Sequence, residues 1–205
     1  MGEIKKINKL TDKKFLNFYE LETVRKTGRP GRYFMASRAE NPEELEINRG
    51  ETRADGVTMY VLCGPKRDKV LLIHQFRWAI GHWVYEFPAG LVEKGESYRD
   101  AAVREVWEET GMKMTPLDVD SMYERPYYMT DGLTDECCAM VYGICEDDAL
   151  KPQHLEESEE IEVVLADRDE VRRILREERL SENAAFQLMH FLHDVEDPFA
   201  FLDVK

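Results

Sequence analysis

The stretch YEFPAGLVEKGESYRDAAVREVWEETGM, from Tyr85 to Met112, carries the strongest structural signal in this chain. Ser97 or the region around Asp100 can begin a helix, because short polar side chains accept hydrogen bonds from the first free backbone N–H groups. Gly111 is well placed to end the helix, since glycine adopts the left-handed conformation common just past a last turn. The stretch therefore predicts a helix that lies between these residues.

Three glutamates lie on one side of this predicted helix. Glu105 and Glu109 are four residues apart, and Glu105 and Glu108 are three apart, so their carboxylates share a face. Two such charges about 4 Å apart repel by roughly 4 kcal/mol at an effective dielectric near 20. A cation should offset this repulsion, and oxygen ligands suit Mg²⁺ or Mn²⁺. The simpler alternative is a solvated acidic helix face without chemistry.

The spacing of the fixed residues resembles the Nudix box, in which a glycine, five residues, a glutamate and seven residues precede Arg-Glu-U-x-Glu-Glu-x-Gly-U, with U apolar. The matching residues are Gly90, Glu96, Arg104, Glu105, Val106, Glu108, Glu109 and Gly111, with Met112 at the last apolar position. Seven fixed identities at roughly 5–7% frequency each make a chance match very rare.

Segments outside the box resemble the ADP-ribose pyrophosphatase-like branch of the Nudix hydrolases. They are Ala36-Ser37-Arg38, Gln75-Phe76-Arg77, Glu86-Phe87-Pro88-Ala89-Gly90, Gly132-Leu133-Thr134-Asp135-Glu136, Glu157-Ser158-Glu159-Glu160-Ile161 and Glu182-Asn183-Ala184-Ala185. One departure concerns the substrate: this branch usually has Ser-Pro-Gly where the chain has Thr130-Asp131-Gly132.

The resemblance implies roles for the box residues. Glu105 and Glu109, with the backbone carbonyl of Ala89, would hold two or three Mg²⁺ or Mn²⁺ ions on a substrate diphosphate, and Glu108 would be a further or water-mediated ligand. Such ions orient the substrate and lower the pKa of a bound water. Glu96 and Arg104 are interpreted as structural, with the arginine tying loop to helix. Gly90 and Gly111 are the structural glycines of the box.

Outside the box, the resemblance implies that Glu157 activates water and that Glu159 helps to bind metal. The alternative is a solvated acidic loop, which such runs usually form. Arg38 and Arg77 are candidates for phosphate or ribose contact, because a guanidinium fork suits phosphate oxygens, and Glu136 is a candidate for a ribose hydroxyl. Surface salt bridges are the alternative for the two arginines.

Composition argues against nucleic acid and membranes as partners. The 205 residues carry a formal net charge of −14, so nucleic acid is not expected as a partner. No window approaches 18 apolar residues, and the N-terminus lacks an apolar signal core, so we expect no membrane association and a cytoplasmic location. The four cysteines form no CxxC pair or secreted-type framework and are expected to be reduced.

The chain reads as an α/β protein, for which the resemblance implies a Nudix-type α/β/α sandwich with a mixed sheet. An acidic stretch up to Asp55 separates a small N-terminal β unit, residues 1–55, from a catalytic domain, residues 56–205. Strands are expected in residues 15–38, 56–63, 69–77, 84–88, 117–128, 136–144 and 161–165, and later helices from Asp169 and Ser181. The N-terminal unit is too small to bury its own core, and we expect it to form a homodimer.

The predicted function is metal-dependent hydrolysis of a nucleoside diphosphate linked to another group. The resemblance implies ADP-ribose, cleaved to AMP and ribose 5-phosphate. Other ADP-sugars, GDP-sugars and NADH remain alternatives that the box does not separate. A non-catalytic sensor of such a metabolite is the rival from another class, but the acidic positions of the box are all present.

Overall fold

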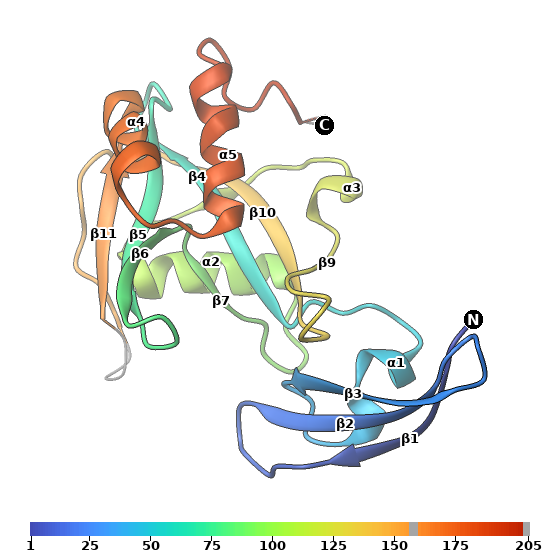
Figure 1. Cartoon of the computed structure of the whole chain (residues 1–205). Coiled ribbons are helices and arrows are strands. Elements are labelled where there is room, and N and C mark those ends of the chain that lie inside the picture. The colour runs from blue at the N-terminus through green and yellow to red at the C-terminus, as the bar shows by residue number, and fades with distance from the viewer. Residues whose placement is uncertain (156–159, 203–205) are drawn as a thin grey trace. The chain divides into compact units, whose positions relative to one another are not determined.

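The computed structural model describes residues 1–155 and 160–202. The chain forms two compact units, of which one comprises Met1–Asp55 with Pro126–Cys138 and the other comprises Gly56–Arg125 with Ala139–Lys205 (Figure 1). The sequence did not indicate that Pro126–Cys138 lies with the N-terminal unit. Among the described residues, no helix is long and apolar enough to cross a membrane.

The N-terminal unit is built on a three-stranded antiparallel sheet in the order β1-β2-β3. Its strands are β1 (Glu3–Lys9), β2 (Asn17–Val24) and β3 (Pro30–Ser37). β2 and β3 pair from Asn17↔Ser37 to Val24↔Pro30. The turn between them contains Gly28 at φ +81°, a conformation that favours glycine.

Strand β1 was not predicted, because its apolar residues do not alternate. Ile4 and Ile7 are three residues apart, whereas residues on one face of a regular strand are two apart. The pairing with β2 is irregular between Ile4 and Lys6. Such a bulge shifts the register by one residue, so that both isoleucines lie on the same side of the strand.

Short elements complete the N-terminal unit. They are a 3-10 turn η1 (Pro42–Glu44), α1 (Glu46–Arg49) and β9 (Tyr127–Tyr128), which pairs with the first residues of β10. The expectation that this unit buries no core of its own is wrong, because it has a small core that consists of Tyr19, Leu21, Met35 and Leu45. Tyr19 is completely buried, and its hydroxyl donates to the Ala39 carbonyl at 2.7 Å.

The second unit contains the larger part of an eight-stranded sheet. The sheet follows the order β11-β5-β4-β10-β8, with β6 on β5, β7 on β4 and β9 on β10. Its strands wholly or largely in this unit are β4 (Gly56–Cys63), β5 (Lys69–Arg77), β6 (His82–Glu86), β7 (Ala89–Leu91), β8 (Thr115–Pro116), β10 (Cys137–Cys145) and β11 (Ile161–Ala166).

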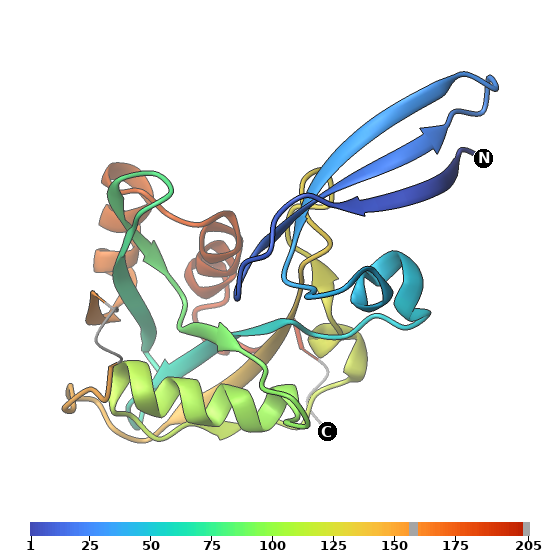
Figure 2. The same ribbon diagram turned by 90° about the horizontal axis from the view of Figure 1, so that it is seen from below.

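Helices cover both faces of this sheet, as Figure 2 shows for the second unit. Strand β4 is buried along its whole length because α2 (Tyr98–Thr110) packs on one face. Tyr60 and Leu62 of β4 belong to a core cluster on the other face, with residues of α4 (Arg168–Glu177) and α5 (Glu182–His193). This layering agrees with the α/β sandwich expected from the sequence.

The expectation of one strand over residues 117–128 is wrong. The chain instead forms α3 (Ser121–Glu124) between the two-residue strands β8 and β9. The side chain of Asp120 accepts a hydrogen bond from the backbone N–H of Met122 at 3.0 Å. This N-cap favours a helical turn over an extended chain.

Candidate active site

The acidic helix α2 forms where the capping residues predict it. Ser97 is the N-cap, and its hydroxyl accepts a hydrogen bond from the backbone N–H of Asp100 at 3.1 Å. Gly111 ends the helix at φ +69°, and its N–H donates to the carbonyl of Trp107 at 2.8 Å. The bounds Tyr98–Thr110 place Glu105, Glu108 and Glu109 in the last two turns.

Arg104 joins this helix to the loop that precedes it. Its Nε and Nη2 donate to the two carboxylate oxygens of Glu96 at 3.0 and 2.9 Å, and Nη2 also donates to the Leu91 carbonyl at 3.0 Å. Its Nη1 donates to Glu105 at 2.8 Å and to Glu108 at 3.0 Å. The Glu96 carboxylate, followed by Glu105 and Glu108, raises the pKa of Arg104, so the guanidinium is the cation that offsets the repulsion within the acidic face.

Two helix carboxylates meet strand β7. The carboxylate of Glu105 lies so close to Gly90 that a Cβ added there would be 1.9 Å from Glu105 Cδ. Glu109 is only 3% exposed, and its Oε2 accepts a hydrogen bond from the backbone N–H of Ala89 at 3.1 Å. Gly90 is therefore required for close approach of a carboxylate, and the box glutamates converge on the Ala89-Gly90 backbone.

The donor chemistry at this site fits a hard divalent cation. Glu105, Glu108, Glu109 and the carbonyl of Ala89 offer only oxygen atoms, the ligands that Mg²⁺ and Mn²⁺ prefer. Within the described part of the chain, however, no three His, Cys, Asp or Glu side chains are grouped closely enough to hold an ion. Arg104 forms salt bridges with Glu105 and Glu108.

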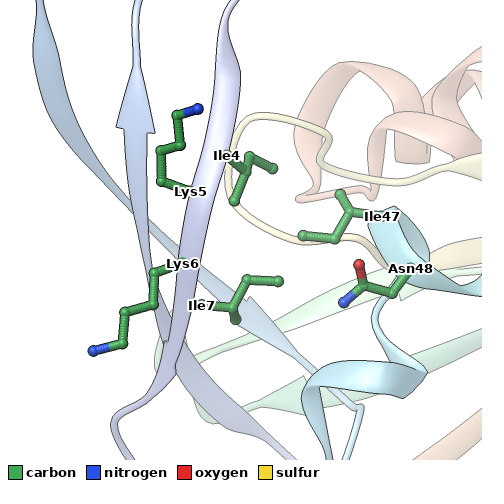
Figure 3. Close-up of a pocket in the computed structure, with 6 residues that line it drawn as sticks. All are labelled: Ile4, Lys5, Lys6, Ile7, Ile47 and Asn48. Carbon is green, nitrogen blue, oxygen red and sulfur yellow. The ribbon is translucent and has the colours of Figure 1, made fainter.

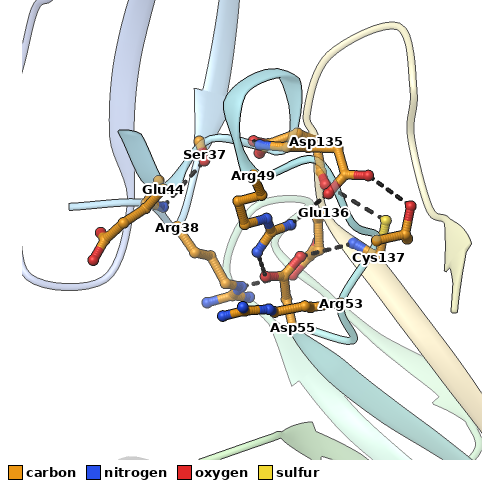
Figure 4. A network of polar contacts seen from close by, with 12 residues as sticks. Ser37, Arg38, Glu44, Arg49, Arg53, Asp55, Asp135, Glu136 and Cys137 are labelled. Carbon is orange, nitrogen blue, oxygen red and sulfur yellow. Dashed lines mark hydrogen bonds and ion pairs between the residues drawn. The ribbon is translucent and has the colours of Figure 1, made fainter. Parts of the chain in front are cut away.

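Each of the two candidate phosphate-binding arginines is paired with a carboxylate of its own unit. In the second unit, Arg77 Nε and Nη2 donate to the two oxygens of Glu86 at 2.9 and 2.5 Å. In the N-terminal unit, Arg38 Nε donates to Glu136 at 2.7 Å (Figure 4). The structure thus brings Arg38 and Glu136 together, although they are 98 residues apart in the sequence.

A polar network surrounds the Arg38–Glu136 pair (Figure 4). Arg49 donates to Glu46 at 2.8 Å and to Asp55 at 3.4 Å, and Asp55 accepts from the Cys137 N–H at 2.9 Å. Burial raises the pKa of Asp55, against the lowering effect of the Cys137 N–H and Arg49. These contacts fix the segment that carries Glu136 within the N-terminal unit.

Comparisons with known proteins identify the family. A model of the NUDIX domain matches residues 52–188. The chain belongs to the Nudix family. It is 33% identical over 123 residues to the putative nudix hydrolase 2 of Caenorhabditis elegans, an alignment that covers 57% of this chain and 53% of that protein. It is 31% identical over 138 residues to an ADP-ribose pyrophosphatase of Escherichia coli, with 62% and 63% covered.

These comparisons confirm the Nudix family and the ADP-ribose pyrophosphatase-like branch predicted from the sequence. The alignments span between one half and two thirds of the length of these two relatives. A solved structure of an ADP compounds hydrolase resembles the Nudix chain with a TM-score of 0.65 at 16% identity, and covers 94% of this chain and 92% of that one. At this identity the likeness supports the fold alone, and it confirms the Nudix-type α/β class.

Two predicted residues of this Nudix chain lie outside the described residues. They are Glu157 and Glu159, the candidates for base and additional metal ligand. Conversely, sequence reasoning missed Glu86 as the partner of Arg77 and missed Gln153, which contacts the end of the box helix. Glu86 could have been found because it begins the segment Glu86-Phe87-Pro88 that resembles the branch, whereas no local pattern marks Gln153.

A cavity of about 440 Å³ lies in the N-terminal unit of the Nudix chain (Figure 3). It is lined by Ile4, Lys5, Lys6, Ile7, Ile47 and Asn48. The three isoleucines converge, while the lysine side chains extend away from them. None of the predicted site residues that the structure describes lines this cavity, and we assign it no part in the site above.

Proposed function

We propose that this chain is a metal-dependent pyrophosphohydrolase that cleaves a nucleoside diphosphate linked to another group. We further propose ADP-ribose as the substrate, with AMP and ribose 5-phosphate as products. The observation that carries the proposal is the approach of two helix carboxylates to one backbone segment: Glu105 lies against Gly90, and Glu109 accepts from the Ala89 N–H. This all-oxygen site suits a cation that must also meet phosphate oxygens.

The groups that would hold two or three Mg²⁺ or Mn²⁺ ions are the carboxylates of Glu105, Glu108 and Glu109 and the carbonyl of Ala89. Bound there, the ions would neutralise the diphosphate and lower the pKa of a bound water. The chain itself supplies Arg104, which offsets the repulsion between Glu105 and Glu108. It thereby keeps the acidic side chains together at little electrostatic cost.

Hydrolysis requires that a water lose a proton as its oxygen attacks one phosphorus, while the bridging oxygen leaves with the other phosphate. We assign the proton acceptor to Glu157 and an additional ligand role to Glu159, on the resemblance to the branch. In the sequence, both residues lie between Leu155 and strand β11.

Recognition of the substrate is assigned to Arg77, Arg38 and Glu136. A guanidinium fork binds two phosphate oxygens as readily as two carboxylate oxygens, so Arg77 is already in a geometry suited to a phosphate. Substrate would compete with Glu86 for this fork. The Escherichia coli relative named as an ADP-ribose pyrophosphatase supports ADP-ribose as the first candidate.

A substrate panel with Mg²⁺ and Mn²⁺ tests the proposal. Purified protein is incubated with ADP-ribose, ADP-glucose, a GDP-sugar and NADH, and the products are separated by ion-exchange chromatography. We expect AMP and ribose 5-phosphate in equal amounts from ADP-ribose, and no turnover with a chelator present. The panel includes the other nucleotides because Thr130-Asp131-Gly132 departs from the pattern of the branch.

Glu109→Gln is the matched variant for this assay. Because Glu109 is a buried ligand candidate on the acidic face, we expect a folded protein that has lost most of its hydrolysis at saturating Mg²⁺. Glu177→Gln, an exposed change of the same type on α4, is the control and should retain wild-type turnover. Wild-type turnover by Glu109→Gln would contradict the ligand assignment, and tight ADP-ribose binding without hydrolysis would favour a sensor.

A further inference from the structure

The last turn of α2 is capped by a segment far away in the sequence. The last carbonyl groups of a helix lack partners within the helix. Here the Glu108 carbonyl accepts a hydrogen bond from the backbone N–H of His154 at 2.8 Å. The Glu109 carbonyl accepts from the side-chain Nε2 of Gln153 at 2.7 Å. Residues 153 and 154 therefore satisfy the carbonyls of two residues whose carboxylates are candidate metal ligands.

Two further contacts hold the same segment against the helix end. The rings of Trp107 and His154 stack with centroids 3.9 Å apart and an angle of 15°. A Cβ added to Gly111 would lie 2.1 Å from the carbonyl oxygen of Pro152. Gly111 is thus required both for its left-handed backbone and for the close approach of this segment.

Gln153 also connects the helix to the sheet. Its Nε2 donates a second hydrogen bond to the carbonyl of Ile161 at 3.1 Å. Ile161 is the first residue of β11 and pairs with Gln75 of β5. One amide nitrogen with two N–H groups therefore bridges the last turn of α2 and the edge strand of the sheet.

Because of these contacts, Glu109 is held at two points. Its carboxylate accepts from the Ala89 N–H, and its carbonyl accepts from Gln153. Without the second contact, the last turn would exchange a protein partner for water and could fray, as helix ends do. Fraying would move the Cα atoms from which the carboxylates of Glu108 and Glu109 extend.

We propose that Gln153 is a positioning residue that fixes Glu108 and Glu109 for divalent-metal binding by capping the last turn of α2 and tying it to β11. This proposal rests on the proposed function, in which these carboxylates hold the ions. Gln153 acts through the helix and is not assigned contact with substrate.

The test uses Gln153→Met, which removes both donors and keeps a side chain of similar length. The matched control is Gln187→Met on α5, where Nε2 donates to the Tyr142 hydroxyl at 3.5 Å. Mn²⁺ binding is measured by electron paramagnetic resonance on the full chain without substrate, and amide exchange is followed in residues 107–112. We expect Gln153→Met to weaken Mn²⁺ binding on the order of tenfold, as the loss of a group that orients a metal ligand does.

Gln153→Met should also speed amide exchange in the last turn, while the KM for substrate at saturating metal changes little. Gln153→Glu, of the same shape, places oxygen atoms against two carbonyls and should weaken Mn²⁺ binding more than Gln153→Met. Gln187→Met should leave Mn²⁺ binding unchanged. Faster exchange in residues 107–112 with wild-type Mn²⁺ affinity would overturn the proposal, because the cap would then be structural only.

The two proposals fail in distinguishable ways. If the wild type binds Mn²⁺ but hydrolyses no member of the panel, the proposed function fails and the Mn²⁺ measurement still decides the role of Gln153. If the wild type hydrolyses ADP-ribose and both Gln153 variants bind Mn²⁺ normally, only the positioning role fails. A wild type that binds no Mn²⁺ overturns the positioning role, and it overturns the proposed function as well only if no member of the panel is hydrolysed.

Discussion

Gly90→Ala is the sharpest single test of the site, because it separates the position of a carboxylate from the stability of the fold. Gly90 lies in strand β7 and pairs with Val57 of β4. A Cβ at this position would be 1.9 Å from Cδ of Glu105 and 2.1 Å from its Oε1. These atoms are the far end of a flexible side chain, so the carboxylate can move while the backbone stays.

The size of the displacement follows from the geometry. Ordinary contact begins at 3.4 Å, so the carboxylate of Glu105 must shift by about 1.5 Å. The shift disrupts its hydrogen bond to Arg104 and costs about 1 kcal/mol of folding free energy. A misplacement of about 1 Å in a reacting group can cost on the order of 100-fold in rate, and we expect a loss of at least that size in kcat/KM.

The assay compares kcat/KM and thermal midpoint for Gly90→Ala and Gly28→Ala. Gly28 lies in the β2–β3 turn at φ +81° with nothing within 4 Å of an added Cβ, so alanine there costs about 1–2 kcal/mol through backbone strain alone. Both variants should therefore melt slightly earlier, and only Gly90→Ala should lose activity. Wild-type kcat/KM in a folded Gly90→Ala protein would refute the placement of a working Glu105 against this strand.

Three further predictions concern the base, acid stability and assembly. Glu157→Gln should lower kcat much more than KM if this residue acts as base, and an unchanged rate across pH would exclude it. The Arg104 hydrogen bonds lower the pKa of Glu96 from its ordinary value near 4.5, so the stability that this ion pair contributes is complete above that pH and is lost as pH falls through the lower folded-state pKa. In acid titrations of the melting temperature, Glu96→Gln should reduce stability at neutral pH and flatten the loss of stability below pH 4.5. A variant with the same titration curve as the wild type would contradict this. The protein should form a homodimer through residues 1–55, with Arg38 acting across the interface, and light scattering that finds a fully active monomer of 24.0 kDa would disprove it.

The box helix could be predicted from the sequence because its determinants are local. The cap at Ser97 and the stop at Gly111 depend on residues within one turn, and the spacing that brings Glu105 near Glu109 is that of any α-helix. In contrast, the contact between Gln153 and the Glu109 carbonyl joins residues 44 apart. One side-chain amide at the end of a loop has no periodic signal, so only the folded chain reveals it.

Strand β1 and residues 117–128 differ from the prediction for definite physical reasons. Strand β1 is not predicted from the sequence, because a bulge places Ile4 and Ile7 three residues apart and breaks the two-residue alternation typical of a strand. The expected strand over residues 117–128 is wrong because the Asp120 side chain caps a helical turn, a local hydrogen bond that competes with an extended chain. The pairing of Arg38 with Glu136 joins residues 98 apart in the sequence, and no local pattern indicates it.

The structure explains why residue 104 of the box is an arginine, although any cationic side chain would balance the negative charge. A guanidinium has five N–H donors, and in Arg104 they meet five acceptors: the two oxygens of Glu96, the Leu91 carbonyl, and one oxygen each of Glu105 and Glu108. A lysine has three donors on one nitrogen and could serve at most three of these acceptors. It would leave at least two of the five acceptors without a donor, so the helix and its loop would lose part of the connection that Arg104 makes. The requirement for arginine therefore follows from the number and planar arrangement of its donors.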